Sequence, residues 1–287
     1  MAMLALFKKA IWISLLIVFL LFAIAVFKGR RKELQVYFFD AGQGDAIYIR
    51  TPEKYDIVID GGPSEVILSK LGEAMPFYDR EIDVMILSHP HADHVTGLIS
   101  ILKNYTVRYV YITGAVHTSY EYQEFLRQLV ARAEIQKIKV DHQFVVALGT
   151  DTKIEFLYPN FDVADEAERE AHPFMEDNLN NTSIVAKLMY KNHSFLFTGD
   201  IEKEVEEYLL ASYPLSLAAD VLKVPHQGSR TSSTLPFLNA VHPQKAIITV
   251  GSGNQYGHPH QEVLSRFNSL RITLLRTDEE GDIRLTY

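Results

Sequence analysis

The chain contains no cysteine. This absence excludes disulfide bonds, thiolate zinc sites and a lipidated N-terminal cysteine, so any bound metal must use histidine, aspartate, glutamate or asparagine ligands. An excess of positive charge is also missing, because 28 lysines and arginines stand against 36 aspartates and glutamates and give a net charge of −8. The chain therefore lacks an overall basic field that would attract nucleic acid, although a local basic groove would not be visible in this average.

Internal repeats and low-complexity segments are absent from the 287 residues. The length suits one large domain or two small ones, and the hydrophobic content of 47% and charged content of 22% are ordinary for a globular protein. Short apolar strand patterns alternate with helical patterns along both halves of the chain. We therefore expect one layered α/β domain in which helices cover two sheets.

A long apolar run lies near the N-terminus. Residues 10–27 carry no charge, and lysines and arginines flank them on both sides. Eighteen residues can just span a hydrocarbon core of about 30 Å, so we predict a transmembrane anchor over residues 1–33 and a globular domain over residues 34–287. The stretch Ala23–Ala25 also resembles a signal-peptide cleavage site, which leaves secretion after cleavage open. We favour the retained anchor because the run is longer than a usual signal core.

The segment 81–97 carries the strongest chemical signal. Its first part is rich in β-branched residues and reads as a buried strand that ends at Ser88. Four metal-capable side chains follow within six residues, namely His89, His91, Asp93 and His94. Imidazole and carboxylate groups suit a divalent cation, and their alternation along the loop would let one loop serve two ions. A solvated, histidine-rich turn is the alternative.

Two later strand ends carry further candidate ligands. Asp200 follows the strand pattern FLFTG, where it would either cap the next helix or bridge two ions. His226 follows another strand, and a lone histidine there would more often be structural. Because loops at one edge of a sheet can converge, we expect both residues to join the histidine cluster as metal ligands.

These motifs resemble those of the metallo-β-lactamase superfamily. The segments that carry the resemblance are, in chain order, FFDAGQGDAIYI, IDGG, LSHPHADHVTGL, NNTSIVAKL, FLFTGD, ADVLKVPHQGSRTSS and GSGNQYGHP. The same order is found in the hydrolase domain of ComEC-type competence proteins, and the resemblance covers roughly residues 34–287. It implies an α/β fold, the αββα four-layer sandwich, with a site for two divalent metal ions, zinc or manganese.

The resemblance has two departures. Asparagines, including Asn180 and Asn181, stand where superfamily members often have a third histidine ligand, so an amide oxygen or water would have to complete that site. Gln227 stands where this branch usually has a second histidine after the ligand. Ser229 and Arg230 follow in the same loop and are candidates for contact with substrate phosphate or with metal.

Several side chains have more than one expected role. Asp93 would ligate metal or accept a proton, and His258 would hydrogen-bond a phosphate oxygen, protonate the leaving group, or be only a turn residue. Asp45 and Asp60 end a turn and a strand near the same edge, so we expect them to support the ligands rather than to bind metal.

The predicted function is a membrane-anchored, metal-dependent hydrolase that cleaves phosphodiesters. Its substrate would be single-stranded DNA or a smaller phosphoester such as a choline-phosphate decoration, and its bilayer contact would be residues 10–27. The resemblance favours an extracytoplasmic catalytic domain, although the flanking cations favour the cytoplasm. A hydrolase of lactones, lactams or other esters, and a non-catalytic binding domain at the membrane, are the alternatives. The sequence does not indicate an oligomeric state.

Overall fold

The computed structural model describes residues 11–21, 33–175 and 178–287. The chain divides into two units, Met1–Glu33 and Leu34–Tyr287, and each is considered by itself. In the first unit, residues 11–21 are helical. Within the described residues, no helix combines the length and apolar character needed to cross a bilayer. The rest of the predicted anchor, residue 10 and residues 22–27, lies outside the described part.

The second unit contains two seven-stranded sheets. The strands of the first sheet are, in spatial order, β14 (Ile283–Thr286), β1 (Gln35–Phe38), β2 (Ala46–Arg50), β3 (Asp56–Gly61), β4 (Glu81–Ile86), β5 (Thr106–Ile112) and β6 (Gln136–Lys139). The strands from β3 to β6 pair in parallel, whereas the pairs at the other end are antiparallel.

The second sheet has the same mixture of parallel and antiparallel pairs. Its strands are, in spatial order, β13 (Thr273–Arg276), β12 (Lys245–Ile248), β11 (Val221–Lys223), β10 (His193–Phe197), β9 (Val185–Tyr190), β8 (Thr152–Tyr158) and β7 (Phe144–Ala147). The strands from β10 to β13 pair in parallel. The carboxyl ends of these parallel strands, and of those in the first sheet, lead into the loops that carry the predicted ligands.

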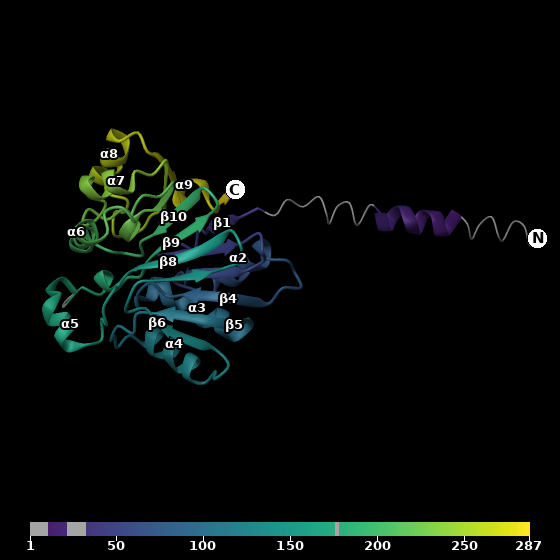
Figure 1. The fold of residues 1–287 in the computed structure, drawn as a ribbon, viewed down its shortest axis with the longest axis horizontal. Helices are drawn as coiled ribbons and strands as arrows, with labels where there is room; N and C mark the ends of the chain where they lie inside the picture. Colours follow the sequence, from purple (N-terminus) through teal and green to yellow (C-terminus); the bar gives the residue numbers. More distant parts are fainter. Residues whose placement is uncertain (1–10, 22–32, 176–177) are drawn as a thin grey trace, which may run out of the picture. The chain divides into compact units, whose positions relative to one another are not determined.

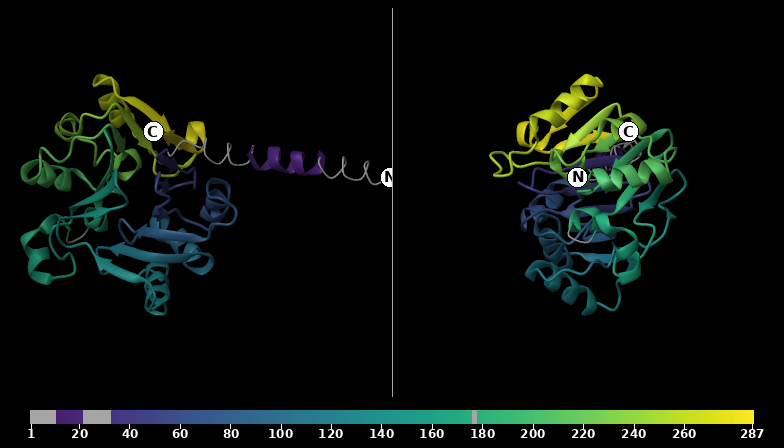
Figure 2. Two further views of the ribbon diagram at one scale, coloured as in Figure 1. Left: turned by 45° about the vertical axis from the view of Figure 1, so that its right-hand side comes forward. Right: turned by 90° about the vertical axis from the view of Figure 1, so that its left-hand side faces the viewer.

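Helices cover the outer face of each sheet (Figures 1 and 2). The helices against the first sheet are α2 (Val66–Ala74), α3 (Ala92–Asn104) and α4 (Tyr120–Val130). Those against the second sheet are α6 (Lys203–Ser212), α7 (Leu235–Val241) and α8 (Gln261–Ser269). Shorter helical segments are α5 (Glu166–Ala171), α9 (Thr277–Glu280), η1 (Pro173–Met175), η2 (Leu179–Thr182) and η3 (Pro225–Gly228).

Three hydrophobic cores lie between these layers and hold them together. The central core joins the facing sides of the two sheets, with Phe38, Ile59 and Ile86 from one sheet and Phe156 and Phe197 from the other. The two outer cores lie between each sheet and its helices. Apolar residues on both faces of the inner strands make this packing possible. The predicted αββα sandwich is therefore confirmed for residues 34–287.

Two segments differ from the sequence-based prediction. The apolar spacing of residues 120–136 predicts one helix, but α4 ends at Val130, and Gln136 begins β6 at the edge of the first sheet. The acidic composition of residues 161–177 predicts a solvated loop, but its described residues contain α5 and η1. Asp165 caps α5 by accepting a hydrogen bond of 3.1 Å from the backbone of Glu168, and His172 stacks on Phe161 with ring centroids 3.9 Å apart.

Candidate metal centre

The loop that follows β4 is fixed by hydrogen bonds to Asp60 at the end of β3. The backbone N–H of Ser88 donates to one carboxylate oxygen over 2.7 Å, and the Ser88 hydroxyl donates to the other over 2.6 Å. Nδ1 of His94 lies 2.8 Å from the same carboxylate. Because this contact uses Nδ1, Nε2 of His94 is left to face the site. Asp60 thus has the role expected of an aspartate that orients a metal ligand.

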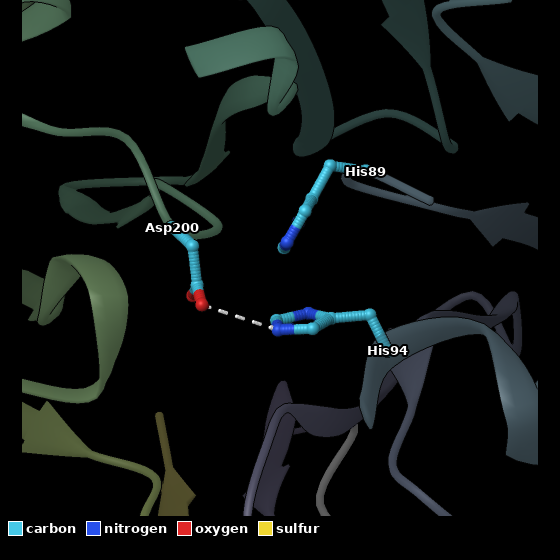
Figure 3. A group of neighbouring side chains, drawn as sticks. All are labelled: His89, His94 and Asp200. Atoms are coloured by element: carbon cyan, nitrogen blue, oxygen red, sulfur yellow. Dashed lines mark ion pairs between the residues drawn. The ribbon is translucent and has the colours of Figure 1, made fainter. Parts of the chain in front are cut away.

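His89, His94 and Asp200 form a buried cluster (Figure 3). One potential ligand atom from each lies within 4.8 Å of the others. Nε2 of His94 is 3.3 Å from Oδ2 of Asp200, and among the described residues this nitrogen makes no hydrogen bond. A buried imidazole nitrogen without a hydrogen bond, facing a carboxylate and a second imidazole, offers the donor set that zinc and manganese accept. The residues present therefore fit a divalent cation.

A cavity of about 300 Å³ opens in front of this cluster. Its walls are formed by Gln43, His91, Ala92, Asp93, Asn180, Asp200, His226, Gln227, Tyr256 and His258. Seven of these were predicted from the sequence, and they come from loops that are up to 167 residues apart, from His91 to His258. The fold thus brings the three predicted strand ends together around one polar cavity.

His226 and Gln227 enter the cavity from a left-handed turn. Their φ angles are +47° and +54°, which non-glycine residues adopt only at a cost in conformational energy. Nδ1 of His226 is 3.2 Å from Oε1 of Glu202, and its Nε2 lies 3.5 Å from the amide nitrogen of Asn180. The Glu202 carboxylate therefore orients this imidazole in the way that Asp60 orients His94.

Gln227 links two of the predicted ligands. Its amide nitrogen donates to Oδ2 of Asp93 over 3.1 Å and to Oδ2 of Asp200 over 3.2 Å. Its amide oxygen contacts Gln43 from the turn after β1. Two carboxylates that face each other repel, and a donor shared between them reduces this repulsion. The residue that departs from the family pattern thus lies at the middle of the site.

Three predicted residues take other positions. The side-chain amide of Asn181 donates to the backbone oxygen of Phe174 and accepts from the backbone of Glu202, so it fastens two loops together. The side chains of Ser229 and Arg230 do not line the cavity; Ser229 contacts Thr231, and Arg230 is exposed. Their contact with substrate or metal stays a prediction.

Asp200 does not cap the helix that follows it. Helix α6 begins at Lys203, and its N-cap residue is Glu202. The backbone N–H of Asp200 donates to the hydroxyl of Ser183 over 3.0 Å and is not part of that cap. The capping alternative is therefore wrong, and the Asp200 carboxylate is left free to face the cluster.

A buried lysine lies directly behind the cluster, and the sequence analysis missed it. Lys223, the last residue of β11, is only 1% exposed, and its ammonium group contacts the Asp45 carboxylate. The same ammonium donates to the backbone oxygen of Gly199 over 2.9 Å and lies 3.4 Å from Oδ1 of Asp200. Thr249 donates to the other oxygen of Asp45. A lysine inside an apolar strand pattern needs a buried partner, and this was the available signal.

Other residues of the site had no clear signal in the sequence. Glu202 and Tyr256 lie in loops whose residue types are ordinary for surface segments. His117 follows β5, and its ring centroid is 6.1 Å from that of His91. Only the folded arrangement shows that Glu202 contacts His226, that Tyr256 lines the cavity and that His117 lies beside His91.

Opposing charges dominate the electrostatics of the cluster. Burial opposes charge on His94, but the carboxylates of Asp200, Asp93 and Asp60 raise the pKa of its imidazole well above the ordinary value. Burial also opposes ionisation of Asp200, yet His94 and Lys223 hold the pKa of that carboxyl well below its usual range. Metal binding requires neutral histidine, so a cation here would compete with the proton on His94.

The other histidines of the site divide into two groups. Burial opposes charge on His226, but its hydrogen bond to Glu202 and the nearby carboxylates raise the pKa of this imidazole, whereas the pKa values of His89, His91 and His258 are lowered. Burial and the charge on His94 lower the pKa of His89 well below its ordinary value, and the same causes lower the pKa of His91. Burial and the neighbouring His226 lower the pKa of His258 to about 4. At neutral pH these three side chains therefore offer imidazole lone pairs rather than positive charge.

Comparison with known proteins agrees with the geometry. The family model of the metallo-beta-lactamase superfamily matches residues 39–251. ComE operon protein 3 of Bacillus subtilis (strain 168) is 30% identical over 94% of this chain and 35% of its own length. Competence protein ComA of Neisseria gonorrhoeae is 30% identical over 88% of this chain and 32% of its own length. The chain thus spans about a third of the length of these curated relatives.

A solved structure shows the same fold. The Zn²⁺-bound PqqB of Methylobacterium extorquens superposes with a TM-score of 0.51 over 85% of this chain and 87% of its own, at 10% sequence identity. The family match, the two-sheet sandwich and the histidine–aspartate cluster agree on the class of protein. The chain belongs to the metallo-β-lactamase superfamily and is a metal-dependent hydrolase related to competence proteins.

Proposed function

We propose that the chain hydrolyses phosphodiesters with the help of bound divalent cations. The observation that carries this proposal is the buried His89, His94 and Asp200 cluster, which opens onto a polar cavity of about 300 Å³. The similarity to competence proteins over 94% and 88% of the chain supports it. The polar lining of the cavity also favours a charged substrate over an apolar ester.

We expect two cations at this site. The residues that would hold the first are His89, His91 and Asp200, and those that would share Asp200 around the second are Asp93, His94 and His226. When bound, such cations neutralise phosphoryl oxygens and make a water molecule more acidic near neutral pH. Asn180, whose amide oxygen is buried without a hydrogen bond in the described part of the chain, is the candidate that completes the first set.

Two side chains of the cavity would take part in the reaction, and a third would position the carboxylates. Asp93 faces the cavity with a carboxylate that can accept the proton of the attacking water. His258 carries a buried Nδ1 that has no hydrogen-bond partner among the described residues, and it can contact a phosphoryl oxygen. The low pKa of His258 argues against its protonating the leaving group. The Gln227 amide keeps the Asp93 and Asp200 carboxylates apart and in place.

The test of this proposal is hydrolysis by the purified full chain with manganese or zinc. Single-stranded DNA and bis-p-nitrophenyl phosphate represent phosphodiesters, whereas nitrocefin and a lactone represent the alternative reactions. We expect metal-dependent cleavage of the phosphodiesters and its loss in Asp200→Asn. Asp220→Asn is the matched control, because Asp220 bonds Ser194 and does not line the cavity. Activity confined to nitrocefin or the lactone would contradict the proposal.

We also propose that residues 10–27 attach the enzyme to a membrane and that the catalytic unit lies outside the cytoplasm. The uncharged run supports attachment, as does the exposure of large apolar side chains over residues 11–21, such as Trp12 at 72% and Phe19 at 67%. The test is extraction of membranes at alkaline pH, together with the mass of the mature N-terminus. Release of the full chain into the soluble fraction would contradict attachment, and an N-terminus after Ala25 would show cleavage.

A further inference from the structure

The loop between β12 and α8 presents two aromatic rings to the cavity. Tyr256 and His258 both line it, together with the predicted ligands Asp200 and His226. Asn254 holds the loop in shape, because its side chain accepts a 3.0 Å hydrogen bond from the His258 N–H and donates one of 2.6 Å to the His258 carbonyl oxygen. These two hydrogen bonds fix the backbone from which the His258 ring projects.

The rings of Tyr256, His258 and His226 contact one another in that order, and His226 is a predicted metal ligand. Tyr256 stacks against His258 with centroids 5.8 Å apart and planes 28° apart. His258 in turn meets His226 edge-on, with centroids 5.4 Å apart. In the described part of the chain, no ring other than His258 packs against Tyr256, whose side chain is 62% exposed. An aromatic face is thus left open beside the place where the substrate phosphate would lie.

We propose that Tyr256, backed by His258, is a stacking subsite for the nucleobase next to the scissile phosphodiester. This inference rests on the proposed phosphodiesterase function and specifies its substrate class as single-stranded nucleic acid. Base stacking on an aromatic side chain tolerates any sequence, since every base has a π face.

The composition of the cavity lining makes ring stacking the main contact available to such a substrate apart from the metal ligands. The chain has a net charge of −8, and its cavity lining contains no lysine or arginine that could contact a phosphate backbone. Binding of an anionic polymer to such a site needs a contribution that does not depend on cationic side chains, and ring stacking supplies it. The cavity volume of about 300 Å³ suits a single nucleotide unit that has left its stack.

The experiment compares two diesters with the same leaving group, using the full chain loaded with manganese. Thymidine 5′-(p-nitrophenyl phosphate) carries a base, and methyl p-nitrophenyl phosphate does not. For Tyr256→Leu we expect an approximately tenfold rise in KM for the thymidine diester and no change for the methyl diester. Tyr256→Phe keeps the ring and should stay within about twofold of the unaltered chain on both.

Tyr78→Leu is the matched control, because Tyr78 is exposed to a similar extent, 69%, and does not line the cavity. It should change neither substrate. An equal loss on both diesters in Tyr256→Leu would overturn the stacking subsite, because the ring would then support the site as a whole. No change on either diester would overturn it as well, as would turnover of a choline-phosphate diester with the same dependence on Tyr256.

A binding measurement separates this inference from the proposed function. Fluorescence anisotropy of labelled oligothymidylate reports the subsite even if no diester is cleaved. About tenfold weaker binding by Tyr256→Leu, with unchanged binding by Tyr78→Leu, would support the subsite while the absence of turnover contradicted the phosphodiesterase. Equal affinities of the unaltered chain and Tyr256→Leu would overturn the subsite whatever the enzymatic activity.

Discussion

Replacement of Lys223 by methionine tests how the buried charges behind the cluster are balanced. The ammonium contacts Asp45, the Gly199 carbonyl and Asp200, and it is almost fully buried. Methionine fills a similar volume but leaves Asp45 without its cation. Removal of one partner from a buried ion pair costs about 3–5 kcal/mol, because the remaining charge stays in a medium of low polarity. We expect Lys223→Met to lose about that much free energy of unfolding.

The double variant Lys223→Met/Asp45→Asn removes both charges and should recover much of the loss. Replacement of a whole buried pair by neutral groups is often close to neutral for stability. The free energies of the two single variants and the double variant should therefore be non-additive, with a coupling of about 2 kcal/mol or more. Thr249 can still donate to an asparagine oxygen at position 45. The Asp200 carboxylate would keep its contacts with His94 and Gln227.

The assay is guanidinium unfolding of the full chain in non-denaturing detergent with a chelator. It should be run above the pKa of Asp45, which burial raises to about 6 and Lys223 opposes. Lys187→Met is the control. This half-buried lysine donates to the Ser216 carbonyl oxygen over 3.0 Å and forms no ion pair within the described residues, so its replacement should cost about 1 kcal/mol or less. Additive effects of the two substitutions would refute the reasoning, since they would mean that Lys223 and Asp45 do not depend on each other.

Three further predictions concern pH, packing and metal affinity. Burial raises the pKa of Glu206 from 4.5 to about 7, so the stability contributed by the protonated carboxyl is fully present below pH 4.5 and is lost as the pH rises through 7. In chemical unfolding, Glu206→Gln should flatten the dependence of the unfolding free energy on pH between these two values. Gly44→Ala should lower the melting temperature by several degrees, because the added Cβ would lie 2.0 Å from the Asp93 carbonyl oxygen and the backbone has a φ of +103°. Gly72→Ala is the control and should not lower it, because no atom lies within 4 Å of the added Cβ there. Gln227→Ala removes a donor from Asp93 and should change calorimetric manganese affinity without loss of fold; unchanged affinity would contradict a role for that amide.

Much of the fold could be predicted because it follows from local patterns. The apolar strand before His89 and the glycine-containing turn before Asp200 mark strand ends, and ligands at strand ends converge in an α/β sandwich. The edge strand β6 could not be predicted, because Gln136–Lys139 alternates weakly and follows directly on a helical pattern. Its place depends on pairing with β5, from which helix α4 separates it along the chain.

The partners of the ligands could not be predicted, because they depend on contacts across the fold. Glu202 orients His226 only because α6 starts beside η3, and Lys223 reaches Asp45 across the two sheets. The contact of Arg230 with substrate phosphate stays a prediction that rests on residue type, because this side chain is exposed and does not line the cavity. Residue type indicates which chemistry is available, and the tertiary structure decides which side chains take part.

The central claim is that the site formed around His89, His94 and Asp200 binds divalent cations, and metal content tests it most directly. The full chain, purified without chelator, and its Asp200→Asn and Asp220→Asn variants should be analysed by mass spectrometry of bound manganese and zinc. We expect at least one ion per chain in the unaltered protein and in Asp220→Asn, and at least a tenfold loss of affinity in Asp200→Asn. Less than about one ion per chain in the unaltered protein, or equal affinity in all three, would contradict the claim.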